Sequence, residues 1–230
     1  MLESMHKHMK WIMWIIIGLI TVAFLFFGIM PSDSGGRTVA TVDGETITID
    51  DWNRAYRNVY ESYRDILKDQ MNDQIAKGLK AQALEGLIAD RLLVKGAERM
   101  GLRVTDKELQ DSIVNIPVFS RQGKFDNKQY EFYLSRMNLS TSAFEMTQRE
   151  FLLRRKLERI IAESVGVTDA ELARIYIERN PKGRAGEFEK TRSSFRQTIM
   201  SERKDEALGA YVQGLRAKSK VVVKQDMLEQ

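Results

Sequence analysis

The stretch TVATVDGETITI, residues 38–49, places two β-branched runs on either side of Asp43-Gly44. A type I′ turn needs positive φ at both central residues, and Asp-Gly accepts this, so the stretch predicts a β-hairpin. A lone hairpin is only marginally stable in water and must pair with another segment. Near the other end of the chain, Lys220-Val-Val-Val-Lys224 has the composition of a strand. We therefore predict a small sheet that joins residues 38–49 to residues 220–224.

The sequence between these strands is dominated by helical patterns. Apolar residues recur at spacings of three and four from Asp50 or Asp51, either of which caps a first helix, and again from roughly residue 75 to 100 in a second. Capping residues then mark the starts of four more helices, at Thr105, Asp126, Ser140 and Thr168. Residues 180–186 form a Pro/Gly-rich break, after which residues 187–218 read as one long helix. The expected fold class is mainly α with a small sheet.

An apolar run precedes this domain. Residues 11–30, WIMWIIIGLITVAFLFFGIM, contain no charge, and as a helix of about 1.5 Å per residue they span roughly 30 Å. A cleaved signal peptide is the alternative, but its apolar run is shorter and ends at a small-residue site that Gly28–Pro31 does not offer. Lys7 and Lys10 precede the run, so the positive-inside rule predicts a cytoplasmic tail and an exported domain. We expect a retained, single-pass inner-membrane anchor.

Composition excludes several classes of chemistry from the exported part. The chain has no cysteine, and its two histidines, His6 and His8, lie in the expected cytoplasmic tail. Thiol nucleophiles and the usual zinc ligands are therefore missing, so we expect no metal, no cofactor and no enzymatic activity. The formal net charge is +4 and the basic residues are dispersed, which argues against nucleic acid as a partner.

Several motifs occur in the order of a known family. They are the hairpin, Ala89-Asp90-Arg91, the segment Ile116–Tyr130 (IPVFSRQGKFDNKQY), and a final helix at residues 204–218 followed by Val221–Val223. Together they resemble the chaperone module of the SurA/PpiD family, periplasmic folding factors of Gram-negative bacteria. The resemblance implies a helical SurA-N-like domain that the final helix and strand close. An uncleaved anchor makes the chain resemble the PpiD branch.

The chain departs from the family pattern in one place. In this family a parvulin-type prolyl isomerase domain follows a Val-Thr-Asp-x-Glu helix, whereas here that helix, Val167–Tyr176, is followed by the break at 180–186 and then by the closing helix. We therefore do not extend isomerase activity to this chain. The expected organisation is a tail at 1–10, an anchor at 11–30, a linker at 31–37 and a chaperone domain at 38–230, made of parts 38–179 and 187–230.

Two functions remain open at this point. The first is a membrane-anchored periplasmic chaperone that binds unfolded or newly translocated envelope proteins without isomerase activity. The second is an adaptor that docks one translocon or envelope partner. Burial of apolar surface would hold clients, and the candidate contacts are aromatic or methionine side chains, namely Trp52, Tyr56, Tyr60, Tyr63, Phe132, Tyr133 and Met137. The groove for the closing helix could also be filled by a second copy, which would give a homodimer.

Overall fold

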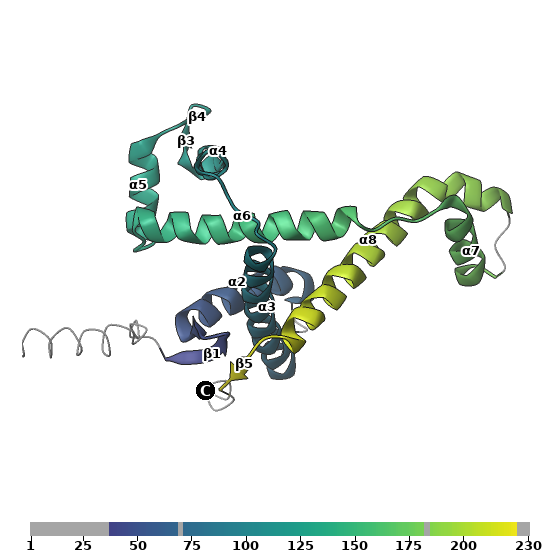
Figure 1. The fold of residues 1–230 in the computed structure, drawn as a ribbon, viewed down its shortest axis with the longest axis horizontal. Coiled ribbons are helices and arrows are strands. Elements are labelled where there is room, and N and C mark those ends of the chain that lie inside the picture. The colour runs from purple at the N-terminus through teal and green to yellow at the C-terminus, as the bar shows by residue number, and fades with distance from the viewer. Residues whose placement is uncertain (1–36, 69–70, 182–184, 225–230) are drawn as a thin grey trace, which may run out of the picture.

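A computed structural model describes residues 37–68, 71–181 and 185–224. The predicted tail, the predicted anchor and most of the predicted linker lie outside these residues. In the part of the chain that the structure describes, no helix combines the length and the apolarity needed to cross a bilayer. The described residues form a mainly helical fold with a long C-terminal helix and a small sheet, as the sequence predicted, and with a second, two-stranded sheet that it did not predict (Figure 1).

The predicted sheet is present. Strands β1 (Thr38–Val42), β2 (Glu45–Thr48) and β5 (Val221–Val223) are antiparallel in the order β2-β1-β5. Asp43 and Gly44 have φ values of 49° and 89°, the positive values that a type I′ turn requires. The Asp43 N–H donates to the Lys220 carbonyl at 2.9 Å, which extends the β1–β5 pairing into the turn. The two ends of the domain therefore meet in one sheet.

Two consecutive helices pack against this sheet. Helix α2 is Ile49–Leu67 and helix α3 is Asp73–Arg99. The prediction that Asp50 or Asp51 caps α2 was wrong, because Thr48 is the N-cap and Asp51 is the acidic partner three residues later in a capping box. Asn72 caps α3, slightly earlier than predicted.

The middle of the chain forms a separate group of elements at one end of a long helix. Helix α4 (Asp106–Val114), the 3₁₀ turn η2 (Pro117–Phe119), the hairpin β3 (Ser120–Arg121) and β4 (Lys124–Phe125), and helix α5 (Asn127–Arg136) precede α6 (Thr141–Glu163). The helix starts agree with the predicted caps. In Figure 1, α4 and α5 lie at one end of α6, away from β1 and β5. We call α4, η2, β3, β4, α5 and the first half of α6 the distal arm.

Helix α8 connects the remaining parts. Helix α7 is Asp169–Arg179 and α8 is Ala185–Ala217, which begins two residues earlier than predicted, within the predicted break at 180–186. The first half of α8 packs on α7, where Tyr176 lies 4.8 Å from Phe188 between ring centroids. The second half packs on α3 and α6. At about 100° per residue, Leu215 lies roughly 180° around the helix from Phe188, so α8 uses opposite faces for its two contacts.

The core has two adjoining clusters. One lies between the sheet, α2 and α3 and includes Val39, Ile47 and Trp52. The other lies where α3, α6 and α8 meet, and Leu157 and Ala97 are fully buried there. The second cluster packs tightly, because a Cβ added at Gly96 would lie 2.9 Å from Leu215 Cδ1. The closing helix therefore docks on its own chain in this structure.

Candidate functional site

The distal arm has its own small core. Five side chains are buried together there, apart from the two clusters described above: Leu109, Ile113, Phe119, Tyr130 and Leu134. The Phe119 ring meets Tyr130 at 4.9 Å and Phe144 at 5.6 Å between centroids, both edge to face. Such contacts add to the apolar burial and fix the ring orientations. The distal arm therefore has a packed core that holds its outer side chains in place.

Large apolar side chains lie exposed on that outer surface. Phe132 is two residues from both Tyr130 and Leu134, so it lies on the opposite side of α5 from the small core and is 56% exposed. Met137, directly after α5, is 64% exposed. The exposed group between residues 132 and 146, which we call the α5–α6 group, consists of Phe132, Met137, Leu139 and Met146. The Phe132 ring contacts Tyr133 and Arg136 on its own helix, and more than half of its surface is left to solvent.

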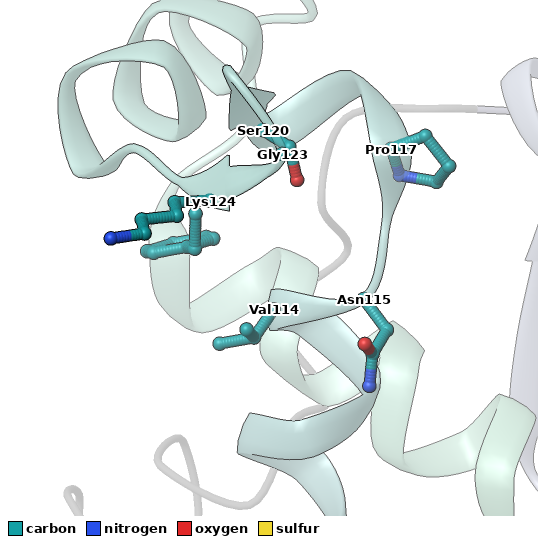
Figure 2. A pocket seen from close by; sticks show the side chains of 7 residues that line it. Val114, Asn115, Pro117, Ser120, Gly123 and Lys124 are labelled. Carbon is teal, nitrogen blue, oxygen red and sulfur yellow. The ribbon is translucent and has the colours of Figure 1, made fainter.

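A hollow of about 690 Å³ lies on the same arm, beside the β3–β4 hairpin. Figure 2 shows Val114 and Asn115 at the end of α4 on one side of it and Ser120 and Gly123 on the other. Pro117, Lys124 and Phe125 complete the lining. The hollow is open and has both apolar and polar walls, so it can accept a side chain of a bound polypeptide but does not enclose a small molecule.

Ion pairs fasten helix α4 to α6. Lys156 Nζ lies 2.6 Å from a carboxylate oxygen of Glu108, and Arg149 lies 2.6 Å from Asp106. The hydrogen bond from Lys156, together with those from Thr105, lowers the pKa of Glu108 to about 2. The carboxylate of the α4 capping box therefore also ties that helix to α6.

The structure divides the predicted contact residues into two places. Trp52 is buried, and its indole N–H donates to the Lys80 carbonyl at 2.9 Å, so it belongs to the core. Along α2, Tyr56 and Tyr60 are half-buried with ring centroids 5.7 Å apart, and Tyr63 is 37% exposed.

On the distal arm, Phe132 and Met137 are exposed, whereas Tyr133 is half-buried against the small core. The structure does not bring the α2 residues and the distal-arm residues together in one cluster. Sequence reasoning missed Leu139 and Met146. The exposure of Met146 could have been predicted, because it is two residues beyond Phe144 and so lies off the apolar face of α6.

Metal chemistry finds no support in the described residues, where no three side chains of His, Cys, Asp or Glu come together as ligands. The candidate site is the set of exposed apolar side chains on the distal arm, because exposed apolar surface of this kind is typical of sites that contact a partner.

Comparison with known proteins gives the family. The model of the SurA-like N-terminal domain matches residues 1–158, more than half of the chain, and the chain belongs to this family. A periplasmic chaperone PpiD from Haemophilus ducreyi is 26% identical over 192 residues, which are 77% of this chain and 30% of that protein. The PpiD of Escherichia coli is 28% identical over 154 residues, which are 62% of this chain and 24% of that protein. A chaperone SurA from Pseudomonas putida is 30% identical over 137 residues, which are 59% of this chain and 31% of that protein.

The matched parts thus span less than a third of the length of these curated relatives. Among solved structures, a SurA-like chaperone from Campylobacter jejuni aligns with a TM-score of 0.50 at 16% identity. The alignment covers 81% of this chain and 98% of that one. At this identity the likeness concerns the fold.

Proposed function

We propose that this protein is a membrane-anchored periplasmic chaperone that holds unfolded or newly translocated envelope proteins. The observation that carries the proposal is the α5–α6 group, because Phe132 and Met137 are 56% and 64% exposed on a firmly packed arm. The names of the relatives, chaperones PpiD and SurA, support the same activity. The proposed topology is that of the sequence: a cytoplasmic tail at 1–10, an anchor at 11–30, a linker at 31–37 and a periplasmic domain at 38–230.

The physical basis of client binding is apolar burial of modest strength. Complete burial of one exposed Phe or Met side chain contributes about 1.5–3 kcal/mol. The loss of translational and rotational freedom on association offsets much of this, so contact with two or three such side chains gives weak binding. Methionine adapts to irregular partners because its side chain is unbranched and flexible. Weak binding without a sequence code fits a holdase, a chaperone that keeps chains from aggregating and lets them go.

We further infer that the protein does not accelerate prolyl isomerisation. Helix α7 ends at Arg179 and α8 begins at Ala185, so the position where the resemblance places a parvulin domain has no room for one. The proposed function therefore separates holding from catalysis.

The test uses the full chain in detergent micelles or vesicles and a denatured outer-membrane β-barrel protein. We expect the protein to suppress aggregation of the β-barrel at equimolar amounts and to leave the rate of a prolyl-peptide isomerisation assay unchanged. Replacing both Phe132 and Met137 with Ser should weaken suppression several-fold. The matched control is Ile177→Ser, because Ile177 is 67% exposed but lies on α7 rather than on the distal arm.

Equal suppression by the double variant and the control would contradict the assignment to the α5–α6 group. Failure of the unmodified protein to suppress aggregation would contradict the holdase proposal itself. Crosslinking to a single folded partner in that case would favour the adaptor function, since an adaptor selects one surface and ignores denatured chains.

A further inference from the structure

The outer face of β5 carries a strip of lysines. Val221 and Val223 pack against the core beneath the sheet, and side chains alternate along a strand, so Lys220, Val222 and Lys224 point to the other face. All three are exposed, with Val222 at 45%. Lys218, in the turn before the strand, is exposed as well. We call Lys218, Lys220, Val222 and Lys224 the lysine face.

Two acidic groups beside this face, both in the β1–β2 hairpin, are already engaged. Asp43 pairs with Arg99 at 2.7 Å and accepts the Lys220 backbone N–H at 2.7 Å. Glu45 pairs with Lys95 at 2.6 Å. Residues 216–224 contain no acidic side chain. The ion pairs found within the described residues do not include Lys218, Lys220 or Lys224, so the positive charge of these three remains uncompensated there.

Chain connectivity limits how far this face can lie from the proposed anchor. Six residues, 31–36, separate the end of the apolar run at Met30 from Arg37, and a fully extended chain of that length reaches roughly 25 Å. Strand β1 begins at Thr38 and pairs directly with β5, with Thr41 opposite Val222. If residues 11–30 span the bilayer, the sheet that contains the lysine face must lie close to the lipid surface.

We propose that the lysine face binds the anionic headgroups of the bilayer that holds the anchor, with Val222 between the lysines at the headgroup level. This inference rests on the proposed anchor. Each lysine near an anionic surface strengthens association by roughly 5-fold, and the anchor keeps the face at a high local concentration of lipid. In Figure 1 the distal arm lies above β1 and β5, beyond α6, and α7 lies far to their right, so a membrane contact at the sheet leaves the distal arm at a distance from the lysine face.

The chain contains no cysteine, so a single introduced cysteine can be labelled specifically. Full-length Val222→Cys and, as control, Ile177→Cys on α7 are labelled with a fluorophore and reconstituted into vesicles that carry a headgroup-attached nitroxide quencher. The vesicles are phosphatidylcholine alone or equal parts of phosphatidylcholine and phosphatidylglycerol. We expect several-fold stronger quenching at position 222 than at 177 in the anionic vesicles only.

Two variants test the role of charge. Changing Lys218, Lys220 and Lys224 to Glu should abolish the quenching at position 222, whereas changing them to Arg should keep it. Circular dichroism checks that each variant is folded. High salt should also reduce the quenching, because screening shortens the range of the attraction.

The other outcomes overturn the inference in distinguishable ways. Equal quenching at 222 in neutral vesicles shows that lipid charge is not what binds the face. No quenching at 222, in protein that still floats with vesicles in high salt, leaves the anchor standing and overturns only the lysine face. Protein that does not float with vesicles at all overturns the anchor together with the inference.

Discussion

The closing of the domain can be tested with one substitution made at two sites of the same helix. Gly96 and Gly86 both lie in α3, but a Cβ at Gly96 would meet Leu215 of α8 at 2.9 Å and Leu157 of α6 at 3.4 Å. At Gly86 nothing lies within 4 Å of the added atom. Replacing each glycine with Leu therefore adds the same side chain to a filled site and to an open one.

The expected difference follows from packing. Both substitutions gain roughly 0.5–1 kcal/mol of helix propensity, so this gain cancels when the two variants are compared. Overpacking at position 96 costs about 1–3 kcal/mol, because Leu215 and the α8 backbone must move. In a chain of this size 1 kcal/mol corresponds to roughly 2–4 °C in Tm. Gly96→Leu should thus melt about 2–12 °C below Gly86→Leu.

Thermal unfolding of the full chain in detergent micelles, followed by far-ultraviolet circular dichroism, measures this difference. Hydrogen exchange adds the location: protection should fall in the second half of α8 and in β5 for Gly96→Leu, while α4 stays protected. Gly96→Ala should lie between the two Leu variants, since its methyl group meets only the flexible ends of the Leu215 and Leu157 side chains. Equal melting of the two Leu variants, with α8 still protected, would refute the docking of α8 on α3.

The parts of the fold that the sequence predicted are those set by local chemistry. Asp43-Gly44 specifies a turn within two residues. The capping box at Thr105 and the N-cap at Thr168 mark helix starts through hydrogen bonds that close within four residues. The pairing of β5 with β1 is a long-range contact, but an unpaired hairpin and one remaining β-branched segment left little choice. Such signals need no knowledge of the tertiary structure.

Other features depend on contacts that no local pattern reveals. The β3–β4 hairpin has only two residues in each strand, and its turn at Gln122-Gly123 lacks the usual Asn-Gly or Asp-Gly signal. Helix α8 changes its apolar face along its length because it packs on α7 first and on α3 and α6 later. Exposure was equally hidden: Trp52 and Phe132 are both aromatic residues on amphipathic helices, yet one is buried and the other is exposed.

Three further predictions concern single interactions. The pKa of Glu108 is lowered from 4.5 to about 2, so the stability that its carboxylate contributes is present above pH 4.5 and is lost as the pH falls toward 2. Glu108→Gln should therefore show a smaller loss of stability over that range in urea unfolding, and an unchanged pH profile would contradict the role of Lys156. Leu172→Ala, at the fully buried contact of α7 with α8, should cost about 2–4 kcal/mol locally, seen as faster hydrogen exchange in α7 but not in α3. Trp52→Phe should lose about 1–2 kcal/mol in thermal unfolding, because it removes the hydrogen bond to the Lys80 carbonyl; full stability would show that this bond contributes nothing.

The arrangement of the distal arm allows binding to be separated from folding. Phe132 and Met137 lie outside the small core that Phe119, Tyr130 and Leu134 build, so polar replacements at the surface positions leave that core intact. Surface substitutions away from buried contacts usually change stability by no more than about 0.5 kcal/mol. A variant with Ser at positions 132 and 137 should therefore have the same melting temperature as the unmodified protein, while its suppression of aggregation falls. Loss of both properties together would mean that these side chains support the arm itself, and client binding would then have to be sought elsewhere on the surface.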